Sequence, residues 1–304
     1  ALGKFHKESD VKVACGYTIP IMLYGIPPSP ENHLRAMEIV GQAGFQGLEL
    51  ELYDELIPEH RRDIGKMKAI LQRYNMTVPS AMAVEEKIFS PNSQTQAKAL
   101  RDFDAITDLI VELGSPLVSI CGYMPPEIRP QGTQLYVGGP PTAVVVGDDF
   151  SWDTFWTNAV DVARQCAAIA KRKGLTLLVE TRANDVFSST DAVMNLLKES
   201  GADNVGVILD VAHVHAGKEY LALVIPKLGK LIKLVHLSDN DGTNAYHYPP
   251  GRGNIDFRAV IRSLKRVGFD GTLIVDTSCQ MDNVVEEAVK ARDYYQRLID
   301  EVQA

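Results

Sequence analysis

The stretch 175-LTLLVE-180 is an apolar run that closes on a glutamate, and the chain repeats this arrangement three more times. The later runs and their final residues are 205-VGVILD-210 with Asp210, 231-LIKLVH-236 with His236 and 272-TLIVD-276 with Asp276. A buried strand seldom ends on a charged or metal-ligating side chain, because such groups are costly to bury without a partner. Four such ends in succession therefore indicate a shared site.

Strand-like and helix-like patterns alternate along the whole chain, and we predict eight of each. The strands are predicted at 11–15, 47–52, 76–81, 117–121, 175–180, 205–210, 231–236 and 272–276. The helices are predicted at 30–43, 59–74, 94–113, 152–173, 190–200, 218–227, 257–267 and 284–302. Continuously apolar strands are typical of a parallel sheet covered on both faces. Eight βα units in 304 residues predict an α/β protein with one (β/α)8 TIM-barrel domain over 1–304.

The alternative fold is an open, doubly wound sheet. Such a sheet normally carries a phosphate-binding GxGxxG turn after its first strand. The corresponding segment here, 14-ACGYTIPIMLYG-25, has no such pattern.

The connection after the fourth strand, 122–150, is unusually long and rich in proline, glycine and small apolar residues. Loops of this length are often lids or binding elements. Within it, 133-TQLYV-137 and 142-TAVVV-146 have the composition of a small hairpin that would cover the barrel mouth. A lid-like insertion and an oligomer contact are both compatible with this sequence.

Composition excludes several classes of protein. The net charge of −8 and the absence of a Lys/Arg cluster argue against nucleic acid as a partner. No run approaches the roughly 18–20 apolar residues that span a bilayer, and 1–10 does not resemble a signal peptide. The four cysteines are far apart and lack CxxC spacing, which indicates reduced core thiols and a cytoplasmic protein.

Side chains at the carboxyl ends of barrel strands converge on one mouth, so we expect Glu180, Asp210, His236 and Asp276 to meet there. Three carboxylates and one imidazole suit one divalent cation, for which we predict Mn²⁺, with Mg²⁺, Co²⁺ and Zn²⁺ as alternatives. Such a cation acts as a Lewis acid that stabilises an enediolate, while neighbouring carboxylates move the proton.

Two flanking segments add candidates. His213 follows Asp210 by three residues and is expected at the same mouth, although the sequence does not decide between His213 and His215. The segment 247-HYPPGRGNIDF-257 contributes His247 and Arg252, and an arginine there could hold substrate oxygens or an anionic group. Alternatively, the segment only shapes the turn into the next helix.

Five motifs occur in the order typical of the xylose isomerase-like TIM-barrel superfamily: 179-VETRAN-184, 209-LDVAHVHAGK-218, 235-VHLSDN-240, 251-GRGNIDF-257 and 273-LIVD-276. The chain most resembles its sugar phosphate isomerase/epimerase branch, which includes D-tagatose 3-epimerase-like enzymes, hydroxypyruvate isomerases and inosose dehydratases. The resemblance covers most of the chain and is strongest over 175–276.

The resemblance implies that Glu180, Asp210, His236 and Asp276 are metal ligands, that Glu180 and Asp276 are the acid/base pair, and that His213 contacts substrate. One position departs from the pattern, because the epimerases have glutamate where this chain has Asp276. Aspartate is one methylene shorter, so it could bind metal without reaching the substrate carbon. His213 or His247 would then serve as the base, and His247 and Arg252 are further substrate-binding candidates.

The leading hypothesis is a metal-dependent isomerase or epimerase of a small sugar or related polyol ketone. A metal-dependent dehydratase or lyase on a sugar-like substrate is the alternative. A DNA-repair endonuclease of the same superfold would need more ligating histidines than the seven present and a basic face. A non-catalytic family member would lack a tight divalent site. The resemblance also implies a homo-oligomer.

Overall fold

The computed structural model describes residues 12–128, 145–278 and 282–303. Its eight strands are β1 (Lys12–Cys15), β2 (Leu50–Tyr53), β3 (Ala81–Val84), β4 (Leu117–Ile120), β5 (Thr176–Glu180), β6 (Val205–Asp210), β7 (Ile232–Leu237) and β8 (Thr272–Val275). They form one sheet in the order β1-β8-β7-β6-β5-β4-β3-β2, and every neighbouring pair is parallel.

The two ends of this sheet meet just before β2. The Cys15 amide donates to the carbonyl of Gly47 at 2.9 Å, and the Glu49 amide donates to the carbonyl of Cys15, also at 2.9 Å. A parallel bridge between Cys15 and Leu48 accompanies these bonds. The sheet therefore curls into a barrel, and the predicted TIM-barrel fold is confirmed.

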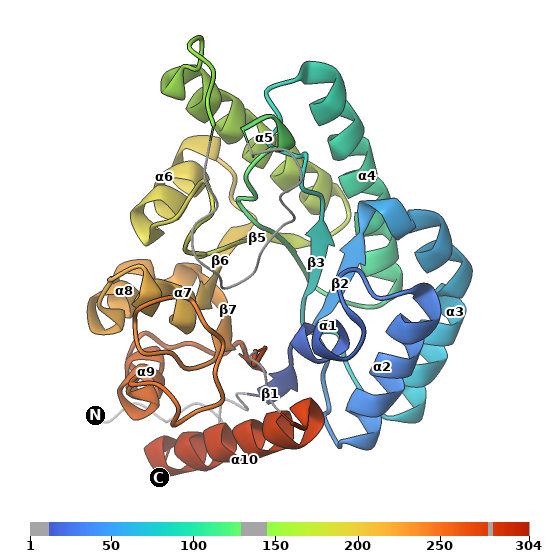
Figure 1. The fold of residues 1–304 in the computed structure, drawn as a ribbon, viewed down its shortest axis with the longest axis vertical. Helices are drawn as coiled ribbons and strands as arrows, with labels where there is room; N and C mark the ends of the chain where they lie inside the picture. The colour runs from blue at the N-terminus through green and yellow to red at the C-terminus, as the bar shows by residue number, and fades with distance from the viewer. Residues whose placement is uncertain (1–11, 129–144, 279–281, 304) are drawn as a thin grey trace, which may run out of the picture.

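Helices surround the strands (Figure 1). They are α1 (Thr18–Tyr24), α2 (Pro30–Gln42), α3 (Ile57–Arg73), α4 (Ser93–Glu112), α5 (Trp152–Arg172), α6 (Thr190–Ser200), α7 (Val211–Ala216), α8 (Leu221–Leu228), α9 (Phe257–Arg266) and α10 (Val284–Gln303). Short 3₁₀ turns span Asp54–Leu56, Pro126–Ile128 and Gly229–Leu231. Several helices start at a polar cap, as where Ser189 accepts the Ala192 amide at the start of α6. None of the helices in the described ranges is long and apolar enough to cross a membrane.

Strand side chains divide into an outer and an inner set, because successive residues of a strand point to opposite faces. The outer set packs against the helices in the main core, as Leu177 and Val179 of β5 do. The inner set forms a small, separate apolar cluster inside the barrel. It consists of Ala14, Leu178, Ile208, Leu234 and Ile274.

The observed elements differ from the sequence predictions in three places. The third strand begins at Ala81 instead of residue 76, since Pro79 has no amide hydrogen for the sheet and Thr77 forms only an isolated bridge to Gly47. The helix predicted over 218–227 is present as α8 but begins at Leu221, because Lys218 adopts a left-handed backbone with φ of 62°, and the short helix α7 before it was not predicted. Helix α1 was not predicted.

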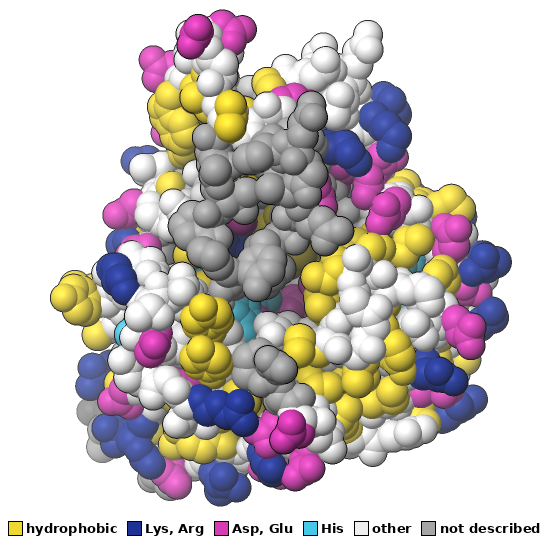
Figure 2. All heavy atoms as spheres, viewed as in Figure 1, with side chains coloured by type: hydrophobic (Ala, Val, Ile, Leu, Met, Phe, Trp, Pro, Cys, Tyr) yellow, Lys and Arg dark blue, Asp and Glu magenta, His cyan; other side chains and the backbone are white. Residues whose placement is uncertain are grey.

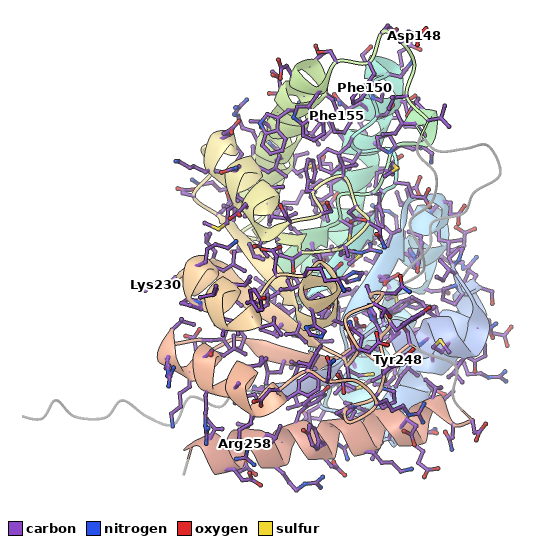
Figure 3. All side chains as sticks on the ribbon, turned by 60° about the vertical axis from the view of Figure 1, so that its left-hand side comes forward. Asp148, Phe150, Phe155, Lys230, Tyr248 and Arg258 are labelled. Carbon is purple, nitrogen blue, oxygen red and sulfur yellow. The ribbon has the colours of Figure 1, made fainter. Side chains whose placement is uncertain are left out.

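The long connection after β4 is described only at its two ends. The Val145 amide donates to the carbonyl of Ile128 at 3.1 Å, which brings these ends together, and Asp148 and Phe150 lie near one end of the molecule ahead of α5 (Figure 3). The predicted lid and hairpin over 122–150 fall largely outside the described residues. Cys15, Cys121 and Cys166 are buried free thiols, as expected.

Two buried histidines couple the stability of the fold to pH. His33 of α2 pairs with the hydroxyl of Tyr17 through Nδ1, and His60 of α3 accepts the Tyr53 amide at 3.3 Å through Nε2. Burial lowers the pKa of His33 to about 3 and that of His60 to about 4. Both imidazoles are therefore neutral in the folded protein, and protonating either one opposes folding.

We expect the free energy of unfolding to fall as the pH drops from 6.5, the usual histidine pKa, towards about 3. Between these values the unfolded chain binds a proton at His33 that the folded chain does not, which costs up to about 1.4 kcal/mol per pH unit. The His33→Asn variant keeps an acceptor for Tyr17 and should show a shallower acid slope in urea titrations across this range. A variant with the wild-type slope would contradict the assignment.

Candidate metal centre and active site

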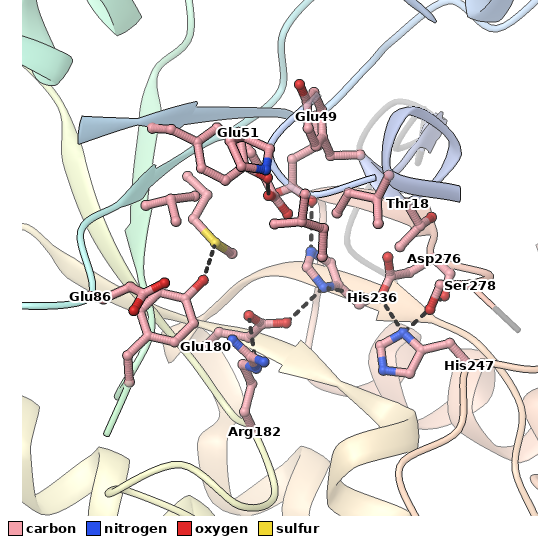
Figure 4. A pocket seen from close by; sticks show the side chains of 18 of the residues that line it. Thr18, Glu49, Glu51, Glu86, Glu180, Arg182, His236, His247, Asp276 and Ser278 are labelled. Carbon is pink, nitrogen blue, oxygen red and sulfur yellow. Dashed lines mark hydrogen bonds and ion pairs between the residues drawn. The ribbon is translucent and has the colours of Figure 1, made fainter. Parts of the chain in front are cut away.

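The four predicted site residues share the inward-facing parity of their strands. Each lies two positions after a member of the inner apolar cluster: Glu180 after Leu178, Asp210 after Ile208, His236 after Leu234 and Asp276 after Ile274. Because strand side chains alternate, these residues continue the same inward rows to the carboxyl ends of β5 to β8. The structure therefore brings together all four residues at the barrel mouth (Figure 4).

His236 stands at the centre of this group. Its Nδ1 lies 3.0 Å from Glu180 Oε1, 3.7 Å from Asp210 Oδ2 and 3.8 Å from Asp276 Oδ2. All four residues are at most 6% exposed. Figure 4 shows Glu180 and Asp276 approaching His236 from different sides.

This group fits a divalent cation. Asp210 Oδ2 is buried and has no hydrogen-bond partner, although buried polar atoms are normally paired. Ligand atoms of Glu180, Asp210 and His236 lie within 4.8 Å of one another, as the donors around one ion do. A mixed oxygen and nitrogen donor set suits Mn²⁺, Mg²⁺, Co²⁺ or Zn²⁺.

The surrounding charges fix the ionisation of the two central groups. Burial raises the pKa of Glu180, but its contacts with His236 and the nearby Arg182 outweigh burial and lower that pKa to about 2. Burial lowers the pKa of His236, but Glu49, Asp210 and Glu180 outweigh it and raise that pKa well above its usual value. Glu180 is thus a carboxylate at neutral pH and is able to accept a proton from a bound molecule.

A second set of side chains continues from the metal centre. Asp210 Oδ1 accepts the His213 amide at 2.9 Å, and His213 Nε2 lies 3.3 Å from His247 Nε2. His247 Nδ1 in turn lies 2.9 Å from Asp276 Oδ2. Asp210, His213 and His247 also offer ligand atoms within 4.8 Å of one another, so the mouth contains a second, overlapping set of possible metal ligands.

Hydrogen bonding defines the protonation of the two histidines. His213 Nδ1 accepts the Ala183 amide at 3.1 Å, and burial lowers the pKa of His213 to about 3, so its proton resides on Nε2. His247 Nε2 must then act as the acceptor, which leaves its Nδ1–H to donate to Asp276. Asp276 outweighs burial and raises the pKa of His247 to about 9, but an imidazolium would place two N–H groups face to face at 3.3 Å. We assign the neutral form to this arrangement.

Sequence reasoning missed Glu49. Its Oε2 lies 2.8 Å from His236 Nε2, on the side of the ring away from the other carboxylates, and its Oε1 is buried without a partner. Burial, partly offset by His236, raises the pKa of Glu49. The period-two alternation of 48-LELEL-52 was the available signal, since it puts Glu49 and Glu51 on the inward face of β2.

A cavity of about 760 Å³ opens above the metal centre. Figure 2 shows histidine and carboxylate side chains at the floor of a hollow near the middle of this face. Its described lining includes the apolar side chains of Ile21, Met22 and Met82, together with tyrosines and charged groups. His213 and His247 both line the cavity. Pockets of this size and mixed lining bind small molecules.

The remaining candidates lie elsewhere. His215 forms a hydrogen bond with Asn254 at 2.6 Å and is not among the described lining residues, so His213 is the imidazole that faces the mouth. Arg252 is half exposed, lies 3.8 Å from Glu287 of α10 and is also absent from the described lining. Its predicted role in substrate binding stays a prediction that this geometry does not support.

Comparison with known proteins agrees with the fold. The fold is that of a TIM-barrel protein with a buried cluster of carboxylates and histidines at its mouth, and a family model described as xylose isomerase-like TIM barrel matches residues 37–298. The chain therefore belongs to the xylose isomerase-like TIM-barrel family.

Relatives with known names are distant. An inosose dehydratase of Clostridium beijerinckii is 22% identical over 283 residues, which are 86% of this chain and 87% of the relative. A solved L-ribulose 3-epimerase is 16% identical, with a TM-score of 0.74 over 96% of each chain. A xylose isomerase-like protein of Mycobacterium smegmatis, solved in complex with magnesium, has a TM-score of 0.72 and 16% identity over 99% of this chain and all of that one.

We expect the Asp210→Asn variant to bind Mn²⁺ at least about a hundredfold more weakly. Mutating a residue that only hydrogen-bonds to a metal ligand typically lowers metal affinity about 10- to 100-fold, and loss of a direct ligand should lower it at least as much. Asparagine still caps α7 through Oδ1, so the fold is retained. Asp256→Asn is the matched control, since Asp256 caps α9 in the same way at 2.9 Å and lies outside the described lining. Calorimetric titration of the metal-free proteins measures the difference, and wild-type affinity in Asp210→Asn would remove this residue from the ligand set.

We expect Glu49→Gln to weaken Mn²⁺ binding about 10- to 100-fold, because a charged partner on Nε2 keeps the proton there and leaves His236 Nδ1 free to bind metal. Glu51→Gln, two residues along the same face of β2, should leave the affinity near the wild-type value. Equal effects of the two substitutions would show that general negative charge, and not the contact with His236, is responsible.

Proposed function

We propose that this protein is a divalent-metal-dependent isomerase or epimerase of a small sugar or related polyol ketone. The observation that carries the proposal is the pair of carboxylates, Glu180 and Asp276, on different sides of His236 beneath one cavity. The activities for which two relatives are named, inosose dehydratase and L-ribulose 3-epimerase, support a carbohydrate substrate.

Glu180, Asp210, His236 and Asp276 would hold the cation, for which we propose Mn²⁺. When bound, a divalent cation polarises a carbonyl and makes the neighbouring carbon more acidic. The protein's own groups then move the proton. Glu180 is ionised and accepts the proton from that carbon, while the Cys121 thiol, 3.0 Å from Glu180 Oε2, and Arg182, 3.9 Å from it, orient the carboxylate.

Return of the proton distinguishes the possible reactions. Asp276 lies on the other side of His236, so a proton delivered from there would invert the carbon and give epimerisation. His247 holds one Asp276 oxygen at 2.9 Å, and His213 lies behind His247. We propose that Asp276, supported by these two histidines, is the second proton carrier and that His213 also contacts substrate.

A dehydratase is the second candidate. Two observations favour it: the relative named inosose dehydratase aligns over most of both chains, and aspartate is shorter than the glutamate of the epimerases at position 276. In that reaction, loss of the same proton would be followed by departure of a hydroxyl group. Glu180, protonated in the first step, would then return that proton to the leaving oxygen, which departs as water.

The test is incubation of the Mn²⁺-loaded protein in D₂O with a panel of ketoses and inososes, followed by NMR. Deuterium at the carbon beside the carbonyl, without loss of water, supports the isomerase or epimerase. Elimination supports the dehydratase, and no exchange with any compound contradicts both.

We expect Glu180→Gln to lower kcat for the exchanged compound by at least about a hundredfold, the usual contribution of a general acid or base. Because Glu180 is also a proposed ligand, the measurement is made with the variant saturated with Mn²⁺ and its metal content determined. Glu112→Gln, an exposed glutamate of α4, is the control. Wild-type turnover by metal-saturated Glu180→Gln would assign proton abstraction to another residue.

A further inference from the structure

The cavity is strongly acidic, and its carboxylates extend beyond those that face His236. Its described lining includes seven carboxylates, one lysine and one arginine. Three of the carboxylates, Glu49, Glu180 and Asp276, face His236. The other four, which we call the outer carboxylates, come from β2, from the turn after it and from the segment after β3. They are Glu51, Asp54, Glu55 and Glu86.

Both cationic side chains of the lining are already paired with carboxylates. Lys87 Nζ lies 3.2 Å from Asp54 Oδ2. Arg182 is 5% exposed, its Nε lies 3.9 Å from Glu180 Oε2 and 3.8 Å from Asp185 Oδ2, and its guanidinium lies over the ring of Tyr123. An incoming anion would have to compete with these carboxylates for either cation.

The segments that the structure does not describe cannot reverse this balance. Residues 129–144, which belong to the connection after β4, contain a single charged residue, Arg129. Residues 279–281 contain none, and in residues 1–11 two lysines are balanced by Glu8 and Asp10. One additional positive charge would leave the lining acidic.

Glu51 is the best placed of the outer carboxylates to contact a bound molecule. It belongs to β2, shares the inward face with Glu49 and accepts the hydroxyl of Tyr53 through one oxygen. Burial, opposed by the Tyr53 hydrogen bond and assisted by the charge of Glu49, raises its pKa to about 7. A positive charge or a hydroxyl donor beside Glu51 would stabilise its ionised form, whereas a second anion would destabilise it.

We propose, building on the function proposed above, that the outer carboxylates restrict the substrate to sugars whose end remote from the metal centre carries a hydroxyl or ammonium group. Carboxylates accept hydrogen bonds from both groups. A phosphate ester or a carboxylate at the same position would face like charges from these carboxylates. The substrate class is therefore an unphosphorylated polyhydroxy ketone or its amino derivative.

The proposal is tested by binding, which needs no turnover. Calorimetry on the Mn²⁺-loaded protein compares three unreactive probes: a hexitol, the same hexitol with a terminal amine, and the same hexitol with a terminal phosphate. We expect the phosphate to bind at least tenfold more weakly than the hexitol, and the amine to bind at least as tightly as the hexitol. A smaller penalty for the phosphate, weaker binding of the amine, or no binding of any probe would overturn the inference.

Two variants test whether Glu51 is responsible for the preference for the hexitol over its phosphate. Glu51→Gln should reduce the preference for the hexitol over its phosphate, and Glu51→Lys should reduce it further, while the exposed Glu112→Gln should retain it. Unchanged preference in both Glu51 variants would overturn the role given to Glu51.

The result of this binding test can be distinguished from the result of the deuterium-exchange test of the proposed reaction. A protein that ranks the probes as expected, but catalyses no deuterium exchange, would retain this selectivity and lose the proposed function. Turnover of a phosphorylated ketose in preference to the free sugar would retain the reaction and overturn the selectivity.

Discussion

The alternation of side chains along parallel strands that close into a barrel is the constraint on which the rest of this structure depends. Every second residue of a strand faces the interior, and the inward rows of β5 to β8 change from apolar to ligating at their carboxyl ends. The register places Asp210 of β6 beside His236 of β7. A shift of one residue in any of these strands would turn its ligand outward, into the helical layer.

This arrangement concentrates charge where the protein can least solvate it. Asp210 is fully buried, and Glu180, His236 and Asp276 are nearly so. Carboxylates removed from water are costly unless opposite charges compensate them. His236 and Arg182 provide part of that compensation, and a divalent cation would supply the rest, so we expect metal binding and stability of the mouth to be linked. The unpaired Asp210 Oδ2 is consistent with this link.

The start of β2 and the residue before it illustrate how one short segment serves two parts of the site. Glu49, just before β2, contacts His236 Nε2, whereas Glu51 of β2 lines the same cavity and pairs with Tyr53. Their inward orientation follows from the same alternation that orients the ligands. The distant relatives share the barrel at 16% identity, so the choice among isomerase, epimerase and dehydratase rests on local chemistry, above all on Asp276 and its contact with His247.

The sequence by itself determined the barrel and its four inward-facing strand ends, because continuous apolar runs closing on ligating residues are local patterns with a fixed period. It did not locate the third strand, where Pro79 interrupts an apolar segment, or the break between α7 and α8 at Lys218. Only the tertiary structure distinguished His213 from His215 and brought Glu49 to His236 across the barrel. It also placed Arg252 beside Glu287. These outcomes depend on how segments distant in sequence pack together, and no local period encodes that packing.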